Sequence, residues 1–203
     1  MQLNPWIEKD FPLVNINDSV ETVKAKMRKY TTNYVIVVDD EKKIKCVLKA
    51  KDIMLSDKDA TLRSICGGFH IAVSEEGKLE DAISAMMENG EFIVPVFDKD
   101  GIVAGVITPY EMLEAFSDLT GMSEPGVKLT FSLMDKPGEL KRIIDVLSWY
   151  GWNIISILTN KGKGNSRMVM VKLDQPSLNS LEQIKKILKE HNIEYEEIDV
   201  DEG

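Results

Sequence analysis

Histidine is scarce in this sequence and basic residues are outnumbered by acidic ones, and each fact excludes a class of function. Only two histidines occur among 203 residues, and neither has companions at the spacing of a metal site or a serine–histidine catalytic group. The 34 acidic residues outnumber the 25 basic ones, giving a formal charge of −9, which argues against binding nucleic acid through bulk positive charge. We therefore expect no metal site and no nucleic-acid partner.

Long hydrophobic runs and cysteines are also few. The longest apolar runs, residues 34–38 and 102–107, fall far short of the ~20 residues of a membrane-spanning helix, and no basic leader with an apolar stretch opens the chain. The only cysteines, Cys46 and Cys66, form no CxxC pair, so we expect reduced, structural thiols. These absences predict a cytoplasmic protein without membrane insertion.

The first half of the chain contains an internal repeat. A shift of 59 positions without a gap aligns two copies with matching residues, among them Val14 with Val73, Met27 with Met86, Val37 with Val96 and Asp39 with Asp98. Helical spacing of apolar residues followed by two short apolar strands predicts a β-α-β-β-α unit in each copy. A unit of this size has too small a core to stand alone, so we expect the copies to pack around a pseudo-twofold axis.

The repeat and the composition predict where domains begin and end. We assign residues 1–58 to the first copy and 59–116 to the second. Residues 117–126 contain two glycines and a proline and are expected to form a linker, after which a new domain occupies residues 127–203.

The last third of the chain is predicted to be a ferredoxin-like β-α-β-β-α-β sandwich. A strand from residue 127 alternates apolar and polar side chains, and Pro137-Gly138 can turn the chain into a helix. A hairpin follows, then a helix that Ser177 or Ser180 can cap, and a final strand. The predicted fold class of the whole chain is α+β.

One constellation in the second copy suits a nucleoside. Thr108 ends a strand and Glu111 lies in the first turn of the next helix. A carboxylate can accept hydrogen bonds from both ribose hydroxyls, while a hydroxyl and a helix N-terminus can donate to phosphate. The same residues are also an ordinary helix-capping arrangement, which competes with the ligand interpretation.

These residues resemble a tandem pair of CBS domains, also called a Bateman module. The family pattern is an apolar-Pro-Val-apolar-Asp strand, then Gly-x-apolar-Gly-apolar-apolar-Thr, with Asp three residues after the Thr. The second copy matches at residues 94–98, Gly101, Gly105 and Thr108, with Glu111 in place of the aspartate. The resemblance covers about residues 5–116.

The first copy departs further from the family pattern. It keeps residues 37–39 and Asp52, but Ile36 replaces the proline, Cys46 the glycine and Lys49 the threonine. Lys49 is either a point charge for a phosphate or a solvated lysine. The resemblance implies clefts for AMP, ADP, ATP, S-adenosylmethionine or a cyclic dinucleotide. The nucleotide-binding residues that we expect are Leu13, Tyr34, Lys49, Asp52, Ile71, Ile93, Pro95, Thr108 and Glu111.

Residues 127–200 resemble an ACT domain, a regulatory fold that often binds amino acids at a dimer interface. The matches are Asp135-x-Pro137-Gly138-x-Leu140 and Gly151-x-Asn153-Ile154. Gly138 can let backbone donors face a carboxylate, while Asp135 and Asn153 can hold an ammonium and a polar side chain. A plain Pro-Gly turn explains the first motif equally well.

Two CBS repeats followed by an ACT domain are similar to the acetoin-utilisation AcuB family. That resemblance implies a homodimeric, non-catalytic sensor that binds an adenine nucleotide in the CBS pair and an amino acid in the ACT domain, and that regulates an enzyme or transporter. The alternative is a dimeric interaction scaffold whose ligand pockets are vestigial. Loss of nucleotide-dependent stabilisation when Asp52, Thr108 and Glu111 are replaced would separate the two.

Overall fold

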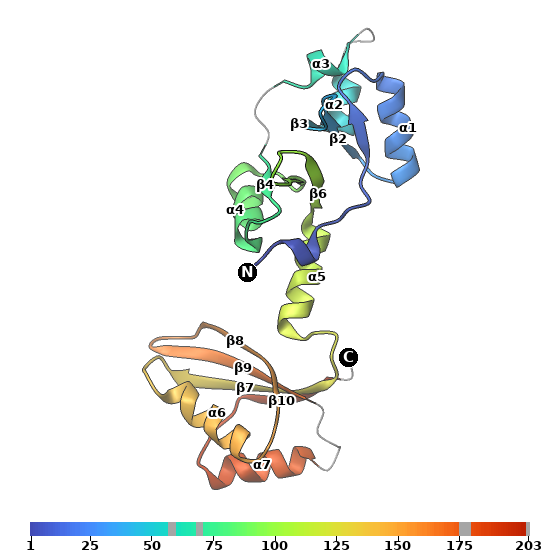
Figure 1. The fold of residues 1–203 in the computed structure, drawn as a ribbon. Helices are drawn as coiled ribbons and strands as arrows, with labels where there is room; N and C mark the ends of the chain where they lie inside the picture. The colour runs from blue at the N-terminus through green and yellow to red at the C-terminus, as the bar shows by residue number, and fades with distance from the viewer. Residues whose placement is uncertain (57–59, 68–70, 175–179, 202–203) are drawn as a thin grey trace. The chain divides into compact units, whose positions relative to one another are not determined.

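The computed structural model describes residues 1–56, 60–67, 71–174 and 180–201 (Figure 1). The chain divides into two compact units, Met1–Ala115 and Phe116–Gly203, and each is considered by itself. No helix in the described part of the chain is long and apolar enough to cross a membrane.

The first unit contains the same series of elements twice. The first copy has β1 (Leu13–Asn15), α1 (Val20–Tyr30), β2 (Tyr34–Val38), β3 (Ile44–Lys49) and α2 (Ala50–Leu55), followed by a short α3 (Leu62–Ile65). The second has β4 (Val73–Ser74), α4 (Leu79–Asn89), β5 (Val94–Phe97), β6 (Val103–Ile107) and α5 (Pro109–Thr120). Elements of the second copy begin 59 or 60 positions after their counterparts, so the predicted β-α-β-β-α repeat is confirmed.

Each copy builds a three-stranded sheet with the same topology. The orders are β1-β2-β3 and β4-β5-β6, with the first pair of strands parallel and the second antiparallel in both sheets. Tyr34 faces Lys49 at one end of the β2–β3 pair. This register places the start of β2 beside the end of β3, where the following helix α2 begins.

The two copies share part of their core. One buried cluster joins Ile36 and Val38 of β2 to Val106 of β6, with Tyr34 and Ile93 packed partly against it. Each copy also has a cluster of its own under its helices. The packing of the two copies into one unit, expected from their small separate cores, is therefore present.

The N-terminal segment packs on the second copy, which differs from our assignment of residues 1–58 to the first. Leu3 is fully buried in the core of the second copy. A 3-10 helix at Asn4–Trp6 follows, and Ile7 after it joins the same core. Glu8 exchanges two backbone hydrogen bonds of 3.0 Å with Val106. The segment covers the edge strand β6 of the second sheet. The internal repeat alone does not predict this contact.

The expected linker is shorter than predicted. Helix α5 continues to Thr120, so residues 117–120 of the predicted linker 117–126 are helical, and β7 already begins at Gly126. No glycine or proline interrupts the helix after Pro109 until Gly121, which has φ of +62° and ends it.

The second unit has the predicted β-α-β-β-α-β order. Its elements are β7 (Gly126–Met134), α6 (Glu139–Trp149), β8 (Ile154–Lys161), β9 (Ser166–Asp174), α7 (Ser180–Glu190) and β10 (Glu197–Asp201). All strand pairs are antiparallel, in the order β10-β7-β9-β8. Helix α7 begins at Ser180, and Ser177, the other expected cap, lies outside the described residues.

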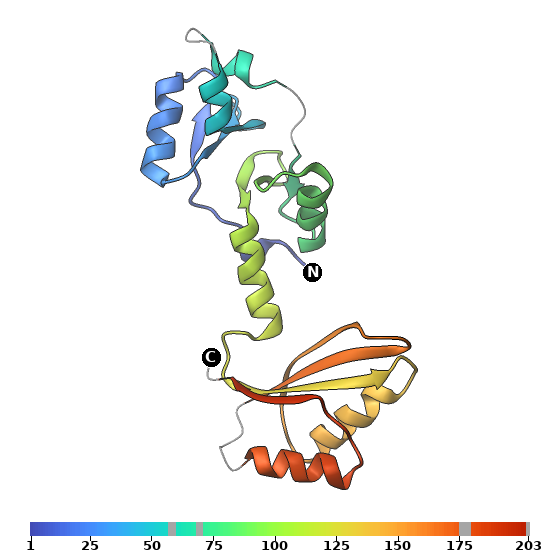
Figure 2. The same cartoon turned by 180° about the vertical axis from the view of Figure 1, so that it is seen from behind.

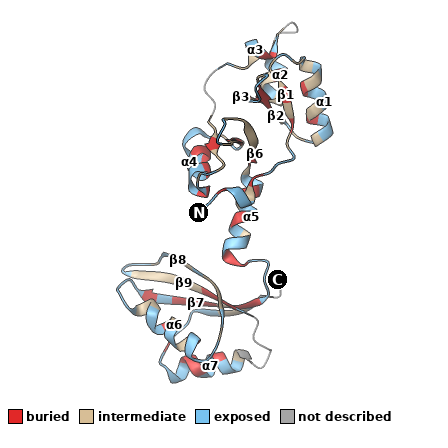
Figure 3. Cartoon of the chain, in the orientation of Figure 1, coloured by how far each residue is buried: buried red, intermediate tan, exposed pale blue. Residues whose placement is uncertain are grey.

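Both helices of the second unit lie on the same face of its sheet (Figures 1 and 2). Between them is a core of fully buried side chains that includes Phe131 of β7, Ile143 of α6 and Ile184 of α7. Figure 3 shows the buried positions along β7. Apolar alternation in β7 and the helical stripe in α6 account for this layer, as the sequence predicts.

Candidate functional site

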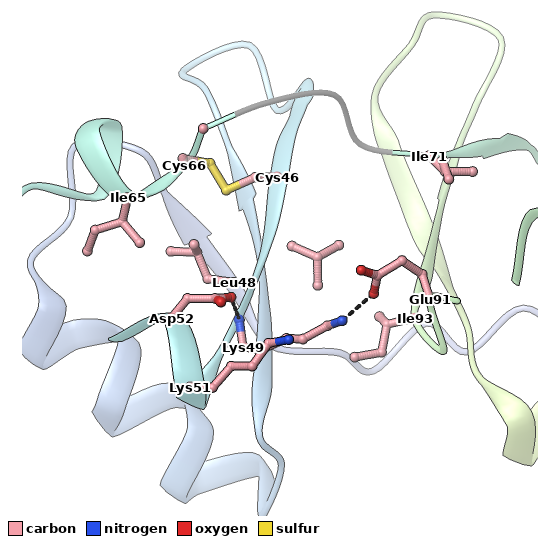
Figure 4. Close-up of a pocket in the computed structure, with 12 residues that line it drawn as sticks. Cys46, Leu48, Lys49, Lys51, Asp52, Ile65, Cys66, Ile71, Glu91 and Ile93 are labelled. Atoms are coloured by element: carbon pink, nitrogen blue, oxygen red, sulfur yellow. Dashed lines mark hydrogen bonds and ion pairs between the residues drawn. A yellow bond between two sulfur atoms is a disulfide. The ribbon is translucent and has the colours of Figure 1, made fainter. Parts of the chain in front are cut away.

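Two pockets in the first unit draw residues from both copies. We call pocket one the cavity of about 250 Å³ lined by Cys46, Val47, Leu48, Lys49, Lys51, Asp52, Ile65, Cys66, Gly67, Ile71, Glu91 and Ile93 (Figure 4). Pocket two has a volume of about 400 Å³ and is lined by Asn33, Tyr34, Lys49, Phe92, Ile93, Thr108, Pro109, Tyr110 and Glu111. In pocket one, the end of β3 and the start of α2 meet residues at the start of β5. In pocket two, the end of β6 and the start of α5 meet residues at the start of β2.

The carboxylate of pocket one is Asp52, in the first turn of α2. Its Oδ2 accepts a hydrogen bond of 2.8 Å from the backbone N–H of Lys49 (Figure 4). This bond satisfies one of the donors at the helix N-terminus and fixes the carboxylate at the pocket wall. The hydrogen bonds of the described residues leave Oδ1 of Asp52 available to a ligand.

Lys49 extends from the end of β3 across pocket one. Its ammonium forms an ion pair with the carboxylate of Glu91, which precedes β5 in the second copy (Figure 4). The Lys49 and Glu91 side chains are 25% and 43% exposed, so the pair is only partly shielded from water. Lys49 is therefore ion-paired with an acid of the other copy, and its role toward a phosphate stays a prediction.

Our expectation of reduced cysteines is wrong. The structure joins Cys46 of β3 to Cys66, directly after α3, in a disulfide with a Cα–Cα distance of 5.8 Å, well inside the range for such bridges. The two residues are 20 positions apart with no CxxC motif, so their spacing gave no signal of proximity. The bridge forms one wall of pocket one and attaches α3 to the sheet (Figure 4).

Glu111 is the carboxylate of pocket two, and it is buried, with only 6% of its surface exposed. Its Oε2 accepts hydrogen bonds from the backbone N–H of Thr108 at 2.6 Å and from the Thr108 hydroxyl at 2.5 Å. The structure therefore contains the helix cap that the sequence offered as the alternative to a ligand site. Both bonds end on Oε2, so the cap does not use Oε1, and Glu111 still lines pocket two.

Tyr34 lines pocket two from the start of β2. Burial raises the pKa of the Tyr34 phenol, and the nearby charges of Glu111 and Glu8 raise it further. The protonated phenol can offer a hydrogen bond or a ring face. Phe92 and Tyr110, 67% and 65% exposed, add two more aromatic side chains to the same pocket.

Seven of the nine expected nucleotide-binding residues line at least one of the two pockets. Leu13 and Pro95 line neither. Leu13 packs against the core that the two copies share, and Pro95 is buried in β5 opposite Val106. Both positions shape the sheets behind the pockets, because alternate residues of a strand point to opposite faces.

The three expected amino-acid-binding residues of the second unit have separate environments. Asp135 accepts two hydrogen bonds of 3.2 Å from the guanidinium of Arg167, which lowers the pKa of the Asp135 carboxyl. Gly138, with φ of +96°, is the residue before α6, and Asn153 is exposed. Arg167 thus holds the carboxylate that we expected to bind a ligand ammonium.

Sequence reasoning missed several lining residues of the pockets. Asn33 and Phe92 are related by the 59-residue shift, and Tyr110 lies between two predicted site residues, so the repeat itself could have indicated all three. Glu91 corresponds to Thr32 in the first copy, and no pattern marks it. In the described residues, no group of three or more histidine, cysteine and acidic side chains could hold a metal ion.

The first unit is thus a paired module, with two three-stranded sheets of the same topology and a pocket at each strand–helix junction. The family model for the CBS domain matches residues 6–59 and 70–118, just over half of the chain. The chain therefore belongs to the CBS domain family and contains a tandem CBS pair.

Relatives of known description share this pair. The magnesium transporter MgtE of Enterococcus faecalis is 29% identical over 98 residues, which are 46% of this chain and 22% of the transporter, so the chain spans about a fifth of that relative. A solved CBS domain pair/ACT domain protein of Thermotoga maritima is 28% identical with a TM-score of 0.52, covering 57% of this chain and 96% of its own. CBSX2, solved in complex with AMP, is 19% identical with a TM-score of 0.52, covering 57% and 95%.

Proposed function

We propose that this chain is a non-catalytic regulatory protein that binds an adenine nucleotide, or a related adenosyl ligand such as S-adenosylmethionine, in pockets one and two. The observation that carries the proposal is the pair of carboxylates Asp52 and Glu111, each held in the first helical turn through one oxygen and each lining a pocket. A fixed acceptor beside a helix N-terminus suits a ribose next to a phosphate.

The remaining lining residues fit the other parts of such a ligand. Thr108 and Lys49 lie at the ends of β6 and β3, where a hydroxyl and an ammonium can meet phosphate oxygens. Ile71 and Ile93 in pocket one, and Tyr34 and Ile93 in pocket two, offer apolar surface to a base. The AMP complex of a protein with the same fold supports adenosine-type ligands here.

For residues 127–203 we propose an ACT domain and, for the chain, a role like that of the AcuB acetoin-utilisation family. The strand order β10-β7-β9-β8 supports the domain assignment, and the name of the Thermotoga maritima protein combines a CBS domain pair with an ACT domain. A homodimer in the cytoplasm that regulates an enzyme or transporter completes this proposal. An amino-acid ligand would have to displace Arg167 from Asp135, or bind to the two together.

The scaffold alternative also has an observation in its favour. Asp52 and Glu111 cap helices, and the Lys49–Glu91 pair spans pocket one, so these charged groups have a structural use without a ligand. A scaffold would dimerise and dock onto a partner, and its stability would not respond to nucleotides.

Titration with nucleotides separates these two functions. In ligand-stripped protein, AMP, ATP or S-adenosylmethionine at about 100 times its Kd should stabilise the fold by about 2.7 kcal/mol, seen as a rise in the melting temperature. Asp52→Asn combined with Glu111→Gln should abolish the rise. Glu88→Gln, an exposed carboxylate on α4 outside both pockets, is the matched control and should keep it. A melting curve unaffected by all three ligands would refute the sensor and favour the scaffold.

A further inference from the structure

Lys49 lines both pockets. It ends β3, where it pairs with Tyr34 of β2, and it is among the residues that line pocket one and among those that line pocket two. Among the described residues that line pocket two, Lys49 is the only basic one, whereas pocket one adds Lys51. In the second copy the corresponding position is Thr108, so the repeat shift places no second lysine there.

The resting partner of Lys49 is an acid of the other copy. The Lys49–Glu91 ion pair links the end of β3 to the segment that precedes β5 (Figure 4). Glu91 lies two positions before Ile93, which lines both pockets. Because both side chains are partly exposed, the pair is weak, and a phosphate can compete with the Glu91 carboxylate for the ammonium. A phosphate monoester at neutral pH carries up to two negative charges and is the stronger competitor.

Pocket two depends on Lys49 alone for positive charge, whereas pocket one also has Lys51, so a phosphate that holds Lys49 in pocket one leaves pocket two without a cation. The chain carries a formal charge of −9, and pocket two also contains the buried Glu111. A second phosphate bound without a cation would meet these negative charges at short range. A neutral nucleoside has no phosphate and therefore needs no cation in either pocket.

We propose that Lys49 is a single cation shared by the two pockets, released from Glu91 by a phosphate-bearing ligand, so that a phosphate bound in one pocket weakens phosphate binding in the other. This inference rests on the proposed nucleotide binding and adds to it a coupling between the pockets. The coupling is reciprocal and is specific to anionic ligands.

Single-pocket variants make the coupling measurable. Asp52→Asn weakens pocket one and leaves the affinity of pocket two, and Glu111→Gln does the reverse. Calorimetric titration of AMP and of adenosine gives each intrinsic affinity from these variants. The coupling factor is the product of the two wild-type association constants divided by the product of the two intrinsic ones.

For AMP we expect a coupling factor of about 0.2, which is a fivefold loss, and for adenosine a factor of about 1. In the Lys49→Met background the AMP factor should rise to about 1. Lys51→Met, which removes a cation from pocket one alone, is the matched control and should keep the AMP factor near 0.2. Glu91→Gln should tighten AMP two- to fivefold in either single-pocket variant without changing adenosine, because it removes the competitor for Lys49.

Equal coupling factors for AMP and adenosine, or an AMP factor that Lys49→Met does not change, would overturn the sharing of Lys49 while leaving nucleotide binding intact. Binding of AMP by only one of the single-pocket variants would overturn it too. Absence of any binding to the wild-type protein is a different result, because it removes the proposed function and this inference together.

Discussion

Positions 105 and 46 are equivalent in the two copies, yet they have opposite packing requirements. At Gly105 an added Cβ would lie 2.6 Å from the carbonyl oxygen of Glu8 and would also overlap the Ile7 side chain. The N-terminal segment can pair with β6 only because position 105 has no side chain. At position 46 a fully buried cysteine instead reaches Cys66.

Gly105→Ala is therefore expected to destabilise the first unit by about 1–3 kcal/mol, the usual cost of overpacking. The Glu8 oxygen is backbone and cannot move aside without breaking its hydrogen bond to Val106. Urea unfolding measures the change. Gly67→Ala is the matched control, because no atom lies within 4 Å of its added Cβ, and it should change stability by less than about 0.5 kcal/mol. Equal stability of the two variants would contradict the close packing at residue 105.

At the scale of single residues, the sequence predicted which side chains form the candidate sites better than it predicted the residues that those side chains contact. Thr108 and Glu111 are three residues apart, so local geometry alone brings them together as predicted. Arg167 lies 32 positions from Asp135, and Glu91 lies 42 positions from Lys49. Those contacts depend on the packing of separate elements, which no local pattern in one sequence contains.

Among the elements, α3 depends most on a covalent link. It is four residues long, far below the ~12–15 residues at which an isolated helix becomes stable. It is attached to the sheet by the buried Leu62 and by the Cys46–Cys66 disulfide. The wall of pocket one that includes Ile65 and Cys66 is thus positioned by the bridge.

Reduction of this disulfide should lower the free energy of unfolding of the first unit by about 3 kcal/mol, the chain-entropy value for a closed loop of about 20 residues. Urea unfolding with and without a dithiol reductant measures it. Cys66→Ser should unfold at the lower stability in both conditions, since it has no bridge to lose. Two titratable thiols in the unreduced, denatured wild-type protein would show that the bridge does not form.

Element order was the most predictable property of the chain, and in the first unit the 59-residue repeat tests the assignments twice. Helices α1 and α4 share apolar spacing, and their predicted positions agree with the structure. The N-terminal segment and α3 escaped prediction because each is too short to show a period. Helix α5 ran past its predicted end because no breaker precedes Gly121.

At the scale of the whole molecule, the described residues form separate hydrophobic cores. The cluster around Phe131 contains only residues of the second unit, while the clusters around Ile36 and Val23 contain only residues of the first. Units with their own cores can unfold independently of one another.

Phe131→Ala is accordingly expected to destabilise the second unit alone. Phe131 is fully buried, so its truncation should cost about 3–5 kcal/mol. Hydrogen exchange followed by mass spectrometry should show faster exchange in peptides from β7, β9 and β10 and unchanged exchange in β2, β3 and β6. The nucleotide response of the first unit should persist. Ile36→Ala, also fully buried, is the reciprocal variant and should accelerate exchange in the first unit only.

A different outcome would be informative about how a signal could cross the chain. If each variant accelerated exchange equally in both units, the two cores would unfold as one cooperative structure, and the independence inferred from the separate clusters would be wrong. If exchange changes only within the altered unit, ligand occupancy in the CBS pair can affect the second unit only by shifting a folded-state equilibrium, since the stabilities of the two cores are then uncoupled.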